Sequence, residues 1–324
     1  MDLETRRARR EQRRRELRRR RRVTASLTGL VIATAVVVLL AIHTGTGSSG
    51  RTSSNARAPG HAKAGASHTS STVAAKAASD VTGPRGTEPV PILMYHVIAE
   101  PPPGAPFPGL YVPPGEFAEQ MRALKRAGWH GVTLDQVEAN WRRGVPLGKG
   151  KPIVISFDNG YQSQYTQALP VLRRLGWVGV ENIQLSGLPP SQGGFGAGQI
   201  QSLLAAGWEL DTQGFTHADL ITLDPAQLHY QVAVARRTIQ RRFHVPVNWF
   251  CYPSGHYDET VLAAVKAAGY SGSTTVVPGW VHPDEDPYRM HRLRVLGGTS
   301  AAGLLSLIED TRGASSAPGS YNGT

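Results

Sequence analysis

The hydrophobic and polar positions of residues 89–311 follow two alternating patterns. Short apolar runs rich in β-branched and aromatic residues predict strands, and the segments between them, with apolar residues at every third or fourth position, predict amphipathic helices. The expected strands are residues 92–96, 153–157, 180–185, 208–212, 249–252, 273–277 and 291–296. The expected helices are residues 114–127, 134–142, 165–175, 199–206, 225–243 and 259–268. Strands that alternate with helices in this way predict a parallel sheet.

Capping residues support the expected helix boundaries. Asp224 and Asp258 precede two of the helices and are good N-caps. Glycine, which commonly ends a helix, follows four of the expected helices, at Gly128, Gly176, Gly207 and Gly269. About seven strand–helix units in one domain predict an α/β fold, namely a distorted or incomplete (β/α) barrel of about seven strands. In such barrels the reactive residues lie at the carboxyl ends of the strands.

A different pattern precedes this domain. Residues 23–43 form an apolar run without a charge, which is long enough to cross a membrane as a helix. A cleaved signal peptide is the alternative, but no small-x-small cleavage site follows Ile42. The dense arginines of residues 1–22 predict a basic cytoplasmic tail. We therefore expect a single-pass signal-anchor helix in the cell membrane, with the N-terminus in the cytoplasm and the main domain outside it.

The positive charge lies mainly before the domain. The chain has a formal net charge of +11, and residues 1–22 alone contain twelve arginines against four acidic residues. The charge beside a predicted membrane span is better explained by topology than by nucleic-acid binding, so no nucleic-acid partner is expected. Residues 44–88 are rich in Gly, Ser, Thr and Ala and predict a flexible linker, and residues 312–324 predict a disordered tail.

The single cysteine, Cys251, excludes an intramolecular disulfide. It lies in the apolar run Trp-Phe-Cys-Tyr at residues 249–252. We therefore expect a buried packing residue rather than a nucleophile.

Polar side chains recur where the expected strands end. His96 ends the first strand and Asp158 ends the second, while Gln213 and His217 follow the fourth. The fifth strand leads into Tyr-Pro-Ser-Gly at residues 252–255. A lone polar residue at a strand end is usually structural. Because the carboxyl ends of parallel strands meet at one edge of a sheet, their recurrence predicts a functional site there.

At these residues the chain resembles the polysaccharide deacetylase family with the NodB-homology domain (carbohydrate esterase family 4). The family motif Thr/Ser-Phe-Asp-Asp-Gly is similar to Ser-Phe-Asp-Asn-Gly at residues 156–160, and His-Ser/Thr-x-x-His is similar to residues 213–217. The segments at residues 93–96 and 250–255 resemble the branch that deacetylates poly-N-acetylglucosamine. The resemblance implies a hydrolase that acts on the N-acetyl groups of an N-acetylated polysaccharide.

The resemblance also implies a role for each matching residue. Asp158 would be the general base and His96 the general acid, with His291 as a second candidate. The metal-ligand positions correspond to Asn159, Gln213 and His217, and a divalent metal such as Zn²⁺ would be the cofactor.

Two of these ligand positions carry exchanged residues. The family has Asp where this chain has Asn159 and His where it has Gln213, and a neutral amide is a weak donor to a transition metal. Asp211 lies two residues before Gln213 and would share its face of the strand, so it is a candidate compensating ligand. A capping or turn role for Asp211 is the favoured alternative.

Three functions stay open from the sequence. The chain is a membrane-anchored, extracytoplasmic deacetylase of a cell-envelope or exported glycan, an inactive relative that still binds glycan, or a metal-independent hydrolase that uses Asp158 and His96. Glycan contacts are expected from the cleft, namely from Tyr161, Tyr252, Pro253, Gly255 and Phe215. Trp249 and Trp280 are further candidates for stacking.

Overall fold

The computed structural model describes residues 83–188, 193–313 and 316–323. The predicted cytoplasmic tail (1–22), the predicted transmembrane helix (23–43) and the linker up to residue 82 lie outside these residues. In the part of the chain that is described, no helix has the length and apolar character needed to cross a bilayer.

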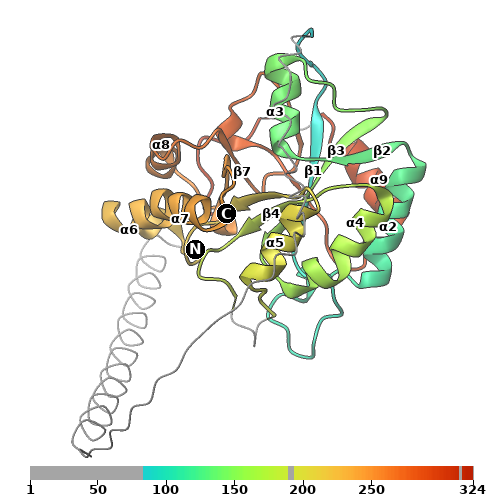
Figure 1. Ribbon diagram of the computed structural model, residues 1–324, viewed down its shortest axis with the longest axis horizontal. Helices are drawn as coiled ribbons and strands as arrows, with labels where there is room; N and C mark the ends of the chain where they lie inside the picture. Colours follow the sequence, from blue (N-terminus) through green and yellow to red (C-terminus); the bar gives the residue numbers. More distant parts are fainter. Residues whose placement is uncertain (1–82, 189–192, 314–315, 324) are drawn as a thin grey trace, which may run out of the picture. The chain divides into compact units, whose positions relative to one another are not determined.

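The centre of the domain is a curled sheet, the incomplete barrel predicted from the sequence (Figure 1). Its parallel strands follow the order β7 (Gly272–Thr274), β6 (Trp249–Cys251), β5 (Glu209–Thr212), β4 (Val180–Ile183), β3 (Lys151–Asn159), β1 (Val90–Tyr95) and β9 (Leu293–Arg294). Two strands lie off this path. β2 (Trp129–Val132) pairs in parallel with the first half of β3, and β8 (Trp280–Val281) pairs antiparallel with the start of β1.

Helices cover the outside of the sheet, with α2 and α9 next to each other on one side and α6, α7 and α8 on another (Figure 1). Their bounds are α2 (Pro114–Arg126), α3 (Leu134–Arg143), α4 (Leu169–Leu175), α5 (Ala197–Ala205), α6 (Pro225–His229), α7 (Ala235–Phe243), α8 (Glu259–Ala267) and α9 (Ala301–Asp310). A π-helical turn at Gln164–Ala168 leads into α4, and another at Tyr230–Val234 joins α6 to α7. The helix expected over 225–243 is therefore continuous.

Helix α3 lies across the amino-terminal edge of the sheet. Its first backbone N–H groups, at Leu134 and Asp135, donate to the carboxylate of Glu209 at the start of β5 over 3.2 and 2.8 Å. The Asp135 carboxylate in turn accepts from the side chains of Asn248 and Trp249 at the start of β6. Carboxyl oxygens that accept from the first N–H groups of a helix satisfy donors that have no partner within the helix. These contacts fix α3 opposite the edge where the strands end.

Alternation along β3 separates the core from the site. Phe157 faces the helices, where its ring stacks on Tyr95 at 5.8 Å and on Trp208 at 5.1 Å between centroids. Asp158, one residue later, faces the interior of the curled sheet, because successive side chains on a strand point to opposite faces. The packing of Phe157 therefore fixes the direction of Asp158.

Three elements were not expected from the sequence. β2 contains Gly131 and buries only its two end residues, so it lacks a strand-like alternation. β8 has two residues, which is too short for a pattern. α9 follows the last expected strand and buries Leu304 and Ile308, one helical turn apart.

Residues beyond both predicted domain borders contact the domain. Residues 83–88, assigned to the flexible linker, contact α3, because the backbone N–H of Gly86 donates to the Asn140 carbonyl over 3.1 Å. Residues 316–323, assigned to a disordered tail, pair with the domain, because Tyr257 and Tyr321 exchange two backbone hydrogen bonds of 2.9 Å. The Tyr257 hydroxyl also donates to the Pro318 carbonyl. A composition rich in small residues hides these local partners.

Candidate functional site

The strand ends surround a cleft of about 700 Å³ at the carboxyl-terminal edge of the sheet. The structure brings together five of the predicted site residues in its lining, namely His96, Asp158, Asn159, Gln213 and His217. His96 follows β1, Asp158 and Asn159 end β3, and Gln213 follows β5. The convergence expected from the strand ends is therefore present.

Asp158 is held in a buried ion pair. Its side chain is 1% exposed, and Arg292 donates to both carboxylate oxygens, from Nη1 to Oδ1 at 2.7 Å and from Nη2 to Oδ2 at 2.9 Å. Asn182 Nδ2 donates a further hydrogen bond of 3.0 Å to Oδ1. Burial raises the pKa of Asp158, but the Arg292 guanidinium outweighs it and holds this pKa at about 2. The carboxylate is ionised at neutral pH and is a weak base.

Arg292 is a site residue that the sequence reasoning missed. It is fully buried, and its Nε also donates to the Thr275 carbonyl over 2.8 Å. Burial lowers the pKa of this guanidinium, but the Asp158 carboxylate raises it by more. The pKa of Arg292 therefore lies above its ordinary value. The available signal was an arginine at a position of the expected strand 291–296 where burial was expected, since a buried cation needs a partner.

Cys251 is buried, as predicted. Its Sγ lies 3.6 Å from Asp158 Oδ2 and accepts from Arg292 Nη2 at 3.2 Å. Burial raises the pKa of the thiol to about 12, so it stays protonated and is a poor nucleophile.

His96 lies beside the ion pair. Its Nε2 is 3.9 Å from Asp158 Oδ2, and its Nδ1 is buried without a hydrogen-bond partner among the described residues. Burial lowers the pKa of His96 to about 4, although the Asp158 carboxylate opposes this shift. The imidazole is therefore neutral at neutral pH, so it can act as a general acid only after it has first accepted a proton. His291, the second candidate acid, lies outside the cleft lining, with Nδ1 3.1 Å from the Pro278 carbonyl.

The three metal-ligand positions line the cleft, but their donors do not fit a divalent transition metal. His217 offers one imidazole, and Asn159 and Gln213 offer neutral amide oxygens. Asp158 cannot add a free carboxylate, because Arg292 binds both oxygens. Within residues 83–188, 193–313 and 316–323, no three His, Cys, Asp or Glu side chains group closely enough to hold a metal ion.

Asp211 does not provide the compensating ligand. It is fully buried in β5, outside the cleft lining, and its Oδ1 accepts from the backbone N–H of Trp249 over 2.9 Å. Burial raises the pKa of Asp211 to about 7. The favoured alternative, a capping or turn residue, is also wrong, because Asp211 lies within a strand. Asp211 pairs in register with Asn182 of β4, and its carboxylate binds the start of β6 instead of lining the cleft.

The predicted glycan-contact residues divide into two groups. Tyr161, Tyr252 and Gly255 line the cleft. Phe215 lies outside the lining and stacks on Tyr230 with centroids 4.3 Å apart, and Pro253 is buried beneath the surface. Of the further stacking candidates, Trp280 is a core residue whose indole donates to the Ile308 carbonyl, and Trp249 lies at the opposite edge of the sheet.

Three of the strand-end residues hold an unusual backbone conformation. Asn159, His217 and Ser254 have φ values of 79°, 54° and 57°, a left-handed region that disfavours residues with a Cβ. All three line the cleft. Backbone strain of this kind commonly gathers at functional sites.

The chain is similar in sequence to proteins of one family. Residues 147–273 match the family model described as polysaccharide deacetylase. The Bacillus subtilis (strain 168) protein named "Putative polysaccharide deacetylase YxkH" is 27% identical over 223 residues, which cover 69% of this chain and 77% of that protein. The poly-beta-1,6-N-acetyl-D-glucosamine N-deacetylase of Escherichia coli (strain K12) is 39% identical over 62 residues, 19% of this chain and 9% of that protein.

A solved structure confirms the fold. The deacetylase PplD of Streptococcus pyogenes, determined in complex with acetate, superimposes with a TM-score of 0.63 at 22% identity. The match covers 69% of this chain and 99% of that one. The family resemblance of the strand-end motifs and the incomplete barrel are both confirmed.

Proposed function

Because this chain contains a polysaccharide deacetylase domain, we propose that it binds an N-acetylated polysaccharide in the cleft and hydrolyses its N-acetyl groups. The observation that carries the proposal is the convergence of His96, Asp158 and His217 at the lining of one open cleft. The 62-residue similarity to a poly-N-acetylglucosamine deacetylase favours a glucosamine-type polymer as the substrate.

The residues of this chain supply a proton acceptor without a metal. Neutral His96 takes a proton from water, whose oxygen attacks the acetamide carbonyl carbon. The Asp158 carboxylate, 3.9 Å away, stabilises the imidazolium that forms. Arg294, exposed in the cleft lining, is a cation suited to the developing oxyanion. The carbon–nitrogen bond then breaks, the imidazolium returns its proton to the leaving amine, and acetate is released.

Glycan binding without hydrolysis is the second candidate. It is favoured by the Arg292 guanidinium, which occupies both oxygens of Asp158, and by the exchange of two ligand positions for amides. A cleft of this kind would retain the sugar contacts of Tyr161 and Tyr252 but not the chemistry.

We further propose that residues 23–43 anchor the protein in the cell membrane, with the domain outside the cytoplasm and acting on a cell-envelope or exported glycan. The support is the uncharged apolar run that follows a dense arginine block. Protease added to intact cells should remove the domain from anchored protein. Full protection of the domain would contradict this topology.

Acetate release from N-acetylglucosamine oligomers tests the activity, with the full chain as the enzyme. The wild type should release acetate, and chelation should leave the rate unchanged. His96→Ala should lower the rate by about 10²–10⁴-fold, the usual contribution of a general acid–base group. Oligomer binding without acetate release would favour the second candidate. Activity that appears only when Asn159→Asp and Gln213→His are combined and metal is supplied would contradict a metal-independent mechanism.

A further inference from the structure

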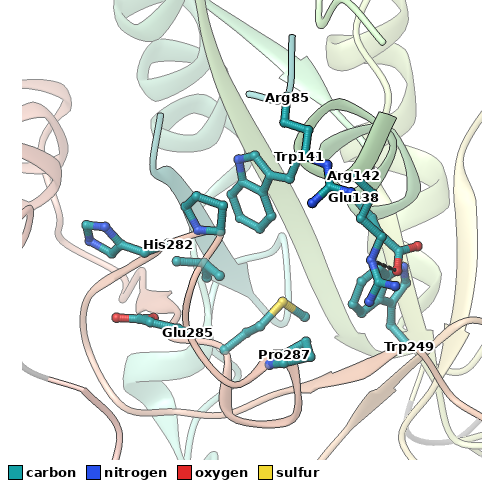
Figure 2. Close-up of a pocket in the computed structure, with 11 residues that line it drawn as sticks. Arg85, Glu138, Trp141, Arg142, Trp249, His282, Glu285 and Pro287 are labelled. Carbon is teal, nitrogen blue, oxygen red and sulfur yellow. Dashed lines mark ion pairs between the residues drawn. The ribbon is translucent and has the colours of Figure 1, made fainter. Parts of the chain in front are cut away.

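A second pocket lies at the amino-terminal edge of the sheet, opposite the cleft. It has a volume of about 390 Å³, within the usual range of about 300–1,000 Å³ for ligand sites. Its walls come from α3, the start of β6, β8 and the segment 282–290 (Figure 2). Among the described residues, none lines both this pocket and the cleft.

The floor and one wall of this edge pocket are aromatic and apolar. Trp249, Val281 and Met290 are buried in the floor, and the half-buried ring of Trp141 forms a wall. Both indole N–H groups are already used, by the Glu88 carbonyl at 3.0 Å for Trp141 and by Asp135 Oδ1 at 2.9 Å for Trp249. A ligand can therefore pack on the face of the half-buried Trp141 ring, above the buried Trp249, and receives no N–H donor from either indole.

The rim of the edge pocket is charged but balanced. Figure 2 shows the Glu138–Arg142 ion pair, with Nε and Oε1 3.1 Å apart, on one side and His282 and Glu285 on the other. Arg85 adds a second guanidinium above Trp141. Two guanidinium groups and two carboxylates favour neither a polyanion nor a polycation. They suit a neutral ligand with many hydroxyl groups, because carboxylates accept from hydroxyls and guanidinium groups donate to them.

We infer that the edge pocket binds one sugar residue of the same N-acetylated polysaccharide, as a second glycan site apart from the cleft. The apolar C–H face of a pyranose ring packs on an indole face, and its equatorial hydroxyls meet the charged rim. The N-acetyl methyl group adds apolar surface suited to the floor. The inference rests on the proposed function, because it takes its ligand from the glycan that the cleft would bind.

Polymer binding to the full chain tests this inference, with a short N-acetylglucosamine oligomer and a long polymer as probes. Trp141→Ala should weaken polymer binding about tenfold, which corresponds to about 1.4 kcal/mol. Arg142→Ala should weaken it as well. Arg143→Ala is the matched control, since Arg143 is the exposed neighbour on α3 outside the pocket lining. Acetate release from the short oligomer should stay unchanged in all three variants.

The outcomes separate the two proposals. A wild-type chain that binds neither probe would overturn both. A wild type that binds both probes, with polymer affinity unchanged in Trp141→Ala and Arg142→Ala, would overturn the second site alone. Trp141→Phe keeps an aromatic face and should retain most of the polymer affinity. A loss of polymer affinity that is confined to Trp141→Ala and Arg142→Ala therefore reports the lost contacts rather than a misfolded domain.

Discussion

The Arg292–Asp158 pair is the residue-scale feature on which the site depends. Both side chains are buried, so each charge is acceptable only in the presence of the other. Arg292→Met should leave Asp158 as an unpaired buried carboxylate and destabilise the fold by about 3–5 kcal/mol. Urea unfolding at neutral pH measures this loss. Arg294→Met, which removes an exposed arginine two residues later, is the control and should change stability little.

Glu181 is a second buried charge site at the residue scale. It is 1% exposed, and both carboxylate oxygens lack a hydrogen-bond partner among the described residues. Burial raises the pKa of Glu181 well above its ordinary value, so the folded protein holds this proton to a higher pH than the unfolded chain does. Because the folded pKa exceeds the unfolded one, the stability present below the unfolded pKa of about 4.3 is lost as the pH rises toward the folded value.

Replacing Glu181 should remove this pH dependence. Glu181→Leu should flatten the decline of melting temperature between acidic and mildly alkaline pH and raise stability at the alkaline end. Thermal unfolding across a pH series measures both effects. An unchanged pH profile in the variant would show that Glu181 finds a partner, such as a water molecule, in solution.

At the scale of elements, backbone strain lies at the end of β3 and in the turns after β5 and β6. Ser254 in the turn after β6 has a φ of 57° and an exposed side chain. Ser254→Gly should stabilise the fold by up to about 1 kcal/mol, because glycine adopts the left-handed conformation without a Cβ clash. Ser254→Ala keeps the clash and serves as the control. Equal melting temperatures for both variants would argue against strain at this turn.

The strands, the helices and the site residues that belong to local sequence motifs could be predicted from the sequence. The site residue that comes from a distant part of the chain could not. Periodicity identified each strand of the main parallel path, and local motifs identified His96 and Asp158. Arg292 is separated from Asp158 by 134 positions, and no local pattern relates them. Asn182 and Asp211 are register partners on β4 and β5, yet Asn182 donates to Asp158 and Asp211 accepts from the Trp249 backbone. Which partner a side chain contacts depends on the pairing between strands, which the periodicity of one strand does not contain.

At the scale of the whole molecule, the carboxyl-terminal segment closes the surface beside the cleft. Residues 316–323 cover Tyr257, which is 1% exposed and follows the cleft turn 252–255. Truncation after Thr311 should expose this ring and break its hydrogen bonds to residues 318 and 321, lowering the melting temperature. Tyr321→Ala should lower it less, because the backbone pairing remains. Identical melting curves for the truncated and full chains would contradict the ordered tail.

The segment 83–88 has a consequence for access to the site. It runs along α3 and enters β1 at the edge of the sheet opposite the cleft, as the hydrogen bond from Trp141 to Glu88 records. The segment by which the chain enters the domain and the cleft therefore lie at opposite edges of the sheet. Residues 83–88 contribute nothing to the cleft lining, so a polysaccharide bound in the cleft does not compete with them for space.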